Sequence, residues 1–154
     1  MKFGDVITAV ASLSVAFILF DFVLSAVMIP VNSSWGVDVA TIVSILASSL
    51  IIGCVFAGKI QEGSRRGAVS IIVVLFALVL TFFTMALFAN PYTGVSMQEV
   101  LESMFQTTGW TTMDWVAYSQ LVFIMIVALN IVFALVFGFI GLYAGSMLRK
   151  PKKT

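Results

Sequence analysis

The sequence predicts an all-α integral membrane protein, a bundle of four transmembrane helices in which both termini are cytoplasmic. Hydrophobic residues make up 61% of the 154 residues and charged residues only 10%, which leaves too little polar surface to keep a globular chain in solution. Four apolar stretches, at about 6–30, 38–58, 68–89 and 118–147, each have the roughly 20 residues needed to cross a hydrocarbon core of about 30 Å. Residues 1–154 are therefore predicted to form a single polytopic membrane domain.

The distribution of basic residues predicts the orientation of these helices. All eight Lys and Arg residues lie at the start of the chain, between the second and third apolar stretches, or at the end. They are Lys2, Lys59, Arg65, Arg66, Arg149, Lys150, Lys152 and Lys153. Short basic loops stay in the cytoplasm. We therefore expect both termini and the turn at 58–67 on the cytoplasmic side of the cell membrane, and residues 31–37 and 90–117 on its outer side.

The first stretch is organised around Asp21, the one clear charge within an apolar run. Ser14, Asp21 and Ser25 share a helical face at i, i+7 and i+11, and this polar stripe is expected to face protein because polar groups are costly in lipid. Pro30 is expected to end the helix, since it lacks an N–H group and has a fixed φ. The run is too long for the apolar core of a signal peptide, so a retained helix is predicted. Asn32 begins an N-glycosylation triplet of a kind that is common by chance.

The second stretch carries two faces of small or polar residues. Thr41, Ser44 and Ser48 lie on one face. Ser49, Gly53 and Ala57 follow at spacings of four, the pattern that lets two helix backbones approach closely. We interpret this second face as a helix-packing surface.

The turn at 58–67 combines glycines with three basic residues. Basic segments beside a membrane can attract anionic lipid headgroups. The bias of positive charge toward the cytoplasm accounts for the same residues, so the sequence by itself favours a determinant of topology.

The third stretch is the most uniformly apolar, and Thr81 and Thr84 are among its few polar residues. In the loop that follows it, Ser96 and Glu99 form an S-x-x-E capping box, which predicts a short helix over about 97–108. Apolar residues recur there at i, i+3, i+4, i+7 and i+8, so the helix is amphipathic. We expect it to lie over the outer mouth of the bundle or against a partner.

The fourth stretch begins within residues 111–120 and runs to Met147, which is longer than one crossing requires. It is therefore expected to tilt or to project outward. One of its faces carries an amide and small residues, namely Asn130, Ala134, Gly138, Gly141 and Gly145. This face is predicted to let another helix backbone come close.

Four polar residues, one on each helix, are expected at a similar depth. Measured from the predicted outer helix ends at 1.5 Å per residue, Asp21, Ser48, Thr81 and Asn130 lie about 12–14 Å into the membrane. An unpaired carboxyl group there would cost about 3 kcal/mol. We therefore interpret the four residues as a candidate intramembrane polar site in which the other three side chains hydrogen-bond to Asp21.

No residue pattern indicates catalysis. Histidine is absent and Cys54 is the single cysteine, so the sequence lacks an ordinary zinc site, a His-ligated haem, a redox pair and a Ser-His or Cys-His nucleophile. We expect no enzyme activity, no cofactor, no metal site and no nucleic-acid partner.

Two functions from different classes fit these observations. The first is a non-enzymatic structural or accessory subunit of a membrane complex, whose partners are the lipid bilayer and either copies of itself or other membrane subunits. The second is a small proton- or cation-coupled transporter in which Asp21 binds the coupling ion. The sequence leaves open whether Asp21 has that role or is a buried hydrogen-bond donor that fixes the packing of the helices.

Overall fold

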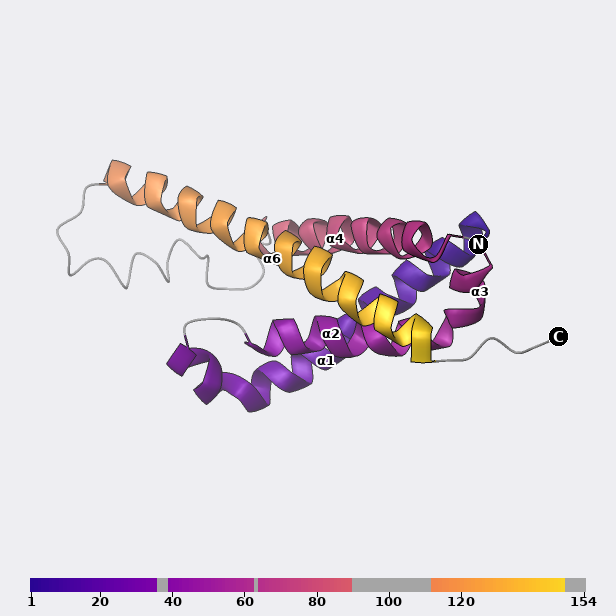
Figure 1. The fold of residues 1–154 in the computed structure, drawn as a ribbon. Helices are drawn as coiled ribbons and strands as arrows, with labels where there is room; N and C mark the ends of the chain where they lie inside the picture. Colours follow the sequence, from indigo (N-terminus) through magenta and orange to yellow (C-terminus); the bar gives the residue numbers. More distant parts are fainter. Residues whose placement is uncertain (36–38, 63, 90–111, 149–154) are drawn as a thin grey trace.

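The computed structural model describes the backbone of residues 1–35, 39–62, 64–89 and 112–148, and within these ranges every regular element is a helix (Figure 1). The helices are α1 (Phe3–Trp35), α2 (Val39–Val55), α3 (Ala57–Gln61), α4 (Arg65–Ala89) and α6 (Thr112–Leu148). The predicted all-α class is confirmed for this part of the chain. The amphipathic helix predicted at about 97–108 falls outside the described residues.

Three of the helices contain segments long and apolar enough to cross a membrane. These segments are Phe3–Val27, Arg65–Thr84 and Ile124–Leu148. Helix α2 is apolar but shorter, with 17 residues. A helix satisfies its own backbone hydrogen bonds, which is why apolar chains in lipid adopt this structure. The helices are therefore compatible with a membrane protein.

The four longer helices pack in a ring. Helices α1 and α6 each pack against both α2 and α4, while the described residues of the two opposite pairs, α1 with α6 and α2 with α4, make little or no contact. Buried apolar side chains from all four helices fill the interior. Phe17 of α1 and Phe76 of α4 meet edge to face there, with ring centroids 5.8 Å apart, an arrangement that aromatic pairs favour.

Helix α1 does not end at Pro30, so that prediction is wrong. The helix continues to Trp35. Proline removes only one backbone hydrogen bond, and neighbouring groups in a membrane helix can compensate for it, although the helix often bends there. In Figure 1 the last turns of α1 change direction before the chain enters α2. The C-terminal end of α1 therefore lies further along the chain than the sequence indicated.

The helical path of α2 continues almost without a break into α3. The Phe56 N–H donates to the Ile52 carbonyl at 2.9 Å, and the Ile60 N–H donates to the Phe56 carbonyl at the same distance. Phe56 itself has φ −92° and ψ 7°, in the sparsely populated region between helix and strand. The break is thus local, and α2 and α3 together extend over more residues than the predicted second span at 38–58.

Helix α6 is the longest element, with 37 residues, or about 55 Å at 1.5 Å per residue. It begins at Thr112, within the stretch 111–120 where the sequence predicts the start of the fourth span. Its N-terminal half extends well beyond the end of α4 in Figure 1. Large apolar side chains are exposed there, including Leu121 (56%) and Ile124 (65%).

Candidate functional site

The structure pairs Asp21 with Thr41. The Thr41 hydroxyl donates a hydrogen bond to Asp21 Oδ1 at 3.0 Å, which joins the middle of α1 to the first turn of α2. Thr41 is buried and Asp21 is half-buried. A carboxylate beside the first turn of a helix also lies at the positive end of the helix dipole. Thr41 was on a polar face in the sequence, but its partnership with Asp21 was not predicted.

Two other members of the predicted polar layer, Ser48 and Thr81, form hydrogen bonds within their own helices. The Ser48 hydroxyl donates to the Ser44 carbonyl at 2.6 Å, and the Thr81 hydroxyl donates to the Ala77 carbonyl at 2.8 Å, so both bonds stay within one helix. Asn130 lies half-buried on α6, which is the helix opposite α1 in the ring.

Helix length explains why Asp21 lies beside Thr41. Asp21 lies 14 residues before Trp35, the end of α1, which is about 21 Å along the axis, whereas its partner Thr41 is the third residue of α2. Ser48 lies seven residues further along α2, about 10 Å beyond Thr41. Depths measured from the predicted helix ends therefore did not indicate that Asp21 pairs with Thr41.

Two buried serine hydroxyl groups lie further along α2 than Thr41. The side chains of Ser44 and Ser49 are fully buried, and their Oγ atoms have no hydrogen-bond partner within the described residues. Ser49 lies against α6, where its Oγ is 3.8 Å from the position that a Cβ atom would take at Gly138. Serine is thus used at this contact for its small size.

The small-residue faces of α2 and α6 lie directly against each other. A Cβ atom built on Gly53 would lie 2.5 Å from the Leu142 carbonyl oxygen, and one on Gly141 would lie 2.7 Å from the Ser49 Cβ atom. At Gly145 a Cβ atom would collide with the Leu50 carbonyl oxygen. Any side chain at these positions would force the backbones apart. Ala57 is also buried, in α3, while Gly138 has more room, with its nearest neighbour 3.7 Å away.

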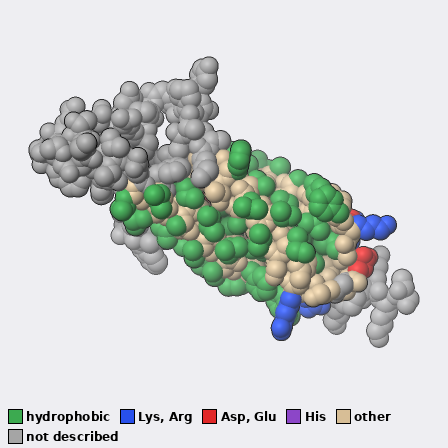
Figure 2. Space-filling view, turned by 90° about the horizontal axis from the view of Figure 1, so that it is seen from above, with side chains coloured by type: hydrophobic (Ala, Val, Ile, Leu, Met, Phe, Trp, Pro, Cys, Tyr) green, Lys and Arg blue, Asp and Glu red, His purple; other side chains and the backbone are tan. Residues whose placement is uncertain are grey.

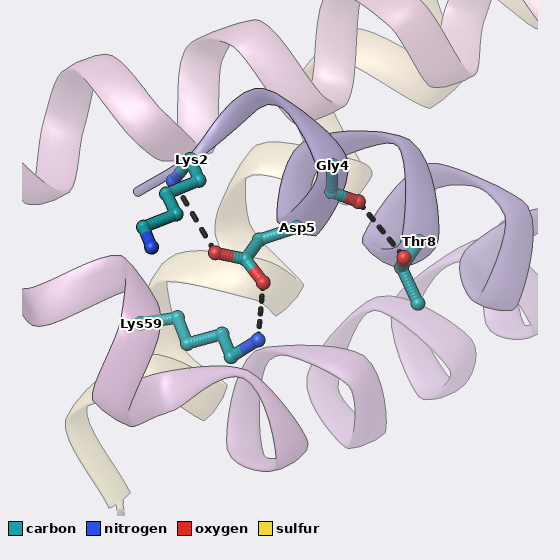
Figure 3. Close-up of polar contacts among 5 residues, drawn as sticks. All are labelled: Lys2, Gly4, Asp5, Thr8 and Lys59. Carbon is teal, nitrogen blue, oxygen red and sulfur yellow. Dashed lines mark hydrogen bonds and ion pairs between the residues drawn. The ribbon is translucent and has the colours of Figure 1, made fainter.

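A set of polar contacts ties the helices together at the end of the ring where the chain starts. Lys59 of α3 forms an ion pair with Asp5 of α1 (Figure 3). Asp5 Oδ2 also accepts from the Lys2 backbone N–H at 3.3 Å, which caps the first turn of α1. The Gln61 side-chain amide donates to the Ser146 carbonyl at 2.6 Å, one of the last carbonyls of α6 that no helical N–H can reach.

We call this set the basic end of the ring, defined by Lys2, Asp5, Lys59, Gln61, Arg65 and Tyr143. Figure 2 shows charged side chains gathered at one end of the described surface and apolar side chains over most of the rest. The sequence grouped the basic residues but did not indicate that Asp5 and Gln61 would connect them to neighbouring helices. No group of three or more His, Cys, Asp or Glu side chains in the described ranges could hold a metal ion.

Comparison of the chain with protein-family models, with curated proteins and with solved structures finds no match.

Proposed function

We propose that the chain is a non-enzymatic integral protein of the cell membrane that crosses the bilayer four times, with both termini in the cytoplasm, and that it serves as a structural or accessory subunit of a membrane complex. The observation that carries this proposal is the exposed apolar side of the long helix α6.

Four crossings are supported by the helix lengths. Three helices have long apolar segments. Helices α2 and α3 together run from Val39 to Gln61 with one local break, which corresponds to about 34 Å of helix and exceeds a hydrocarbon core of about 30 Å. The ion pair between Lys59 and Asp5 brings the start of α1 to the level of α3, as antiparallel crossings require.

The length of α6 supports a protein partner. If Leu148 lies at the inner boundary of the hydrocarbon core, Ile124 lies 24 residues away, about 36 Å along the helix, and Leu121 about 40 Å away. If α6 stands along the membrane normal, both positions are beyond a core of about 30 Å, yet both side chains are exposed and apolar. A neighbouring subunit would cover apolar residues at that height, whereas lipid tails reach them only where the helix tilts.

A photo-crosslinking amino acid at position 124 tests this proposal in the native membrane. Ile140 is the matched control, because it lies on the same helix, is 51% exposed, and is only about 12 Å from Leu148. We expect crosslinks to protein from position 124 and to lipid from position 140. Crosslinks to lipid alone from both positions would contradict the subunit assignment.

The contact between Asp21 and Thr41 favours a second candidate function, a small proton- or cation-coupled transporter. The carboxylate lies between two helices and accepts from a buried hydroxyl, and all Lys and Arg residues of the chain belong to other segments. A group in this setting is suited to exchange a proton or bind a cation.

Reconstitution into liposomes distinguishes the second function from the first. A transporter that uses Asp21 gives a pH-dependent flux that Asp21→Asn abolishes. Infrared difference spectroscopy gives a second measure, because the carboxyl band of Asp21 titrates with bulk pH only if the group exchanges protons with water. A folded protein with neither flux nor a titrating band excludes this function.

A further inference from the structure

Two arginines at the start of α4, one of them part of the basic end, have charges that no described carboxylate neutralises. The only ion pair among the described residues joins Lys59 to Asp5. Arg65 and Arg66 are the first two residues of α4, and the nearby Glu62 is exposed and forms no ion pair within the described ranges. These two guanidinium groups are therefore available for an anion.

An aromatic pair on α6 holds one of these arginines in place. The guanidinium carbon of Arg65 lies 6.0 Å from the centroid of the Tyr143 ring. Tyr143 is itself stacked on Phe139, with centroids 5.7 Å apart and an angle of 8° between the planes. A cation–π contact uses the face of the guanidinium group and leaves its N–H donors free to bind a ligand.

The surroundings combine this positive charge with an exposed apolar surface. Ile71 on α4 and Met147 and Leu148 on α6 are exposed, and α4 and α6 pack side by side. A free phosphate ion would use only the arginines. A phospholipid would use both features, because its phosphate group is attached to acyl chains that need apolar cover.

We propose that Arg65 and Arg66, with Arg65 held over Tyr143, bind the phosphate group of an anionic phospholipid whose acyl chains lie along the apolar surface of α4 and α6. The forked N–H donors of arginine match the oxygen atoms of a phosphate group. This proposal rests on the membrane location proposed above. It goes beyond a role in topology, because a topology determinant needs only positive charge on one side and not an arginine fixed on an aromatic ring.

Native mass spectrometry of the full chain, released from nanodiscs that contain equal amounts of phosphatidylglycerol and phosphatidylcholine, tests the proposal. We compare the wild type with R65Q/R66Q and with a matched control, K152Q/K153Q, which removes the same charge from the C-terminal tail. The wild type and the control are expected to retain phosphatidylglycerol in preference to phosphatidylcholine. In R65Q/R66Q the affinity for phosphatidylglycerol should fall about thirtyfold, as expected for two basic contacts near the surface.

A second pair of variants keeps both arginines in case R65Q/R66Q does not insert correctly. Tyr143→Leu should reduce the preference for phosphatidylglycerol because Arg65 loses its support, whereas Tyr143→Phe should retain it because the ring remains. Equal losses in R65Q/R66Q and K152Q/K153Q would overturn the proposal in favour of net charge alone, and displacement of the lipid by inorganic phosphate would overturn it in favour of a free-anion site. A wild type that is inserted in the nanodisc but has no lipid preference would also overturn it, and would leave the proposed membrane function intact.

Discussion

The contact between α2 and α6 and the contact between α1 and α4 hold the same ring together in different ways. Across α2 and α6 the backbones touch, since a single added carbon at Gly53, Gly141 or Gly145 would meet main-chain or Cβ atoms of the other helix. Across α1 and α4 the helices meet through large side chains, represented by the edge-to-face rings of Phe17 and Phe76.

This difference shows which interactions stabilise a chain that is apolar nearly everywhere. In lipid, the removal of apolar area from the surroundings does not drive helices together, so close packing and hydrogen bonds must do so. The glycine contact is stabilised by close packing of many atoms, but it tolerates no added volume. The aromatic contact is instead sensitive to loss of volume, because its neighbours move only partly into the space that a shorter side chain leaves.

The largest expected effect is at the glycine contact. In Gly145→Ala the new Cβ atom would collide with the Leu50 carbonyl oxygen and lie 2.9 Å from the Cys54 nitrogen. Because both are backbone atoms, the helices must separate, at a cost of about 3 kcal/mol. Equilibrium unfolding in mixed micelles measures the loss. Gly58→Ala is the control, since a Cβ atom there meets nothing within 4 Å; equal stability of the two variants would contradict the close contact of α2 with α6.

A smaller loss is expected at the aromatic contact. Phe76 is 1% exposed, and Phe76→Ala leaves a cavity of roughly 100 Å³, which costs about 2 kcal/mol at 24 cal/mol per Å³. The transfer contribution that is added in water-soluble cores is absent here, because the unfolded reference state is also surrounded by lipid or detergent. The same unfolding measurement applies. Phe82 is exposed on the same helix, so Phe82→Ala should leave stability unchanged, and a comparable loss there would argue against the packing of α1 on α4.

The polar contact between α1 and α2 should contribute less than either packing contact. A double-mutant cycle with Asp21→Ala and Thr41→Val is expected to give a coupling energy of about 1 kcal/mol, the size typical of hydrogen bonds between membrane helices. A parallel cycle with Asp21→Ala and Ser48→Ala should be additive, since Ser48 bonds to carbonyls of its own helix. Coupling to Ser48 in place of Thr41 would restore the polar layer that the sequence suggested.

The smallest effect is expected at the ion pair between Lys59 and Asp5. Lys59 is half exposed, so solvent and salt weaken the attraction between the two groups. We expect Asp5→Asn to lower the thermal unfolding midpoint slightly at low ionic strength and not at all near 1 M salt, where the screening length is about 3 Å. Glu62→Gln, at an exposed carboxylate, is the control and should have no effect at either salt concentration. A loss that persists in high salt would show that Asp5 acts mainly through the cap at Lys2.

The sequence was most informative where a property depends on neighbouring residues along one helix. The spacing of Ser49 and Gly53, and of Gly141 and Gly145, placed these residues on single helical faces, and the structure brings the two faces into contact. Pro30 shows the opposite case. Its effect depends on whether surrounding groups compensate for one lost hydrogen bond, and the helix continues through it.

The candidate polar site depended on distances between helices, which the sequence does not contain. A shift of five residues in the end of α1, from Pro30 to Trp35, corresponds to about 7.5 Å of depth. That shift exceeds the length of a hydrogen bond by more than twofold, so the expected partners of Asp21 could not be chosen from helix ends alone. The structure pairs Asp21 with Thr41, which lies two turns before the predicted partner Ser48 on α2.

The sequence alone determined that the described chain folds as long apolar helices and which of their faces are small, because helix formation and periodicity are set by local hydrogen bonds and residue spacing. Only the tertiary structure decided which helices are neighbours, which polar groups meet, and that Asp5, Gln61 and Tyr143 join the basic end together. These contacts depend on the relative depth and rotation of separate helices. Packing between helices fixes both quantities, and the pattern along any one helix does not.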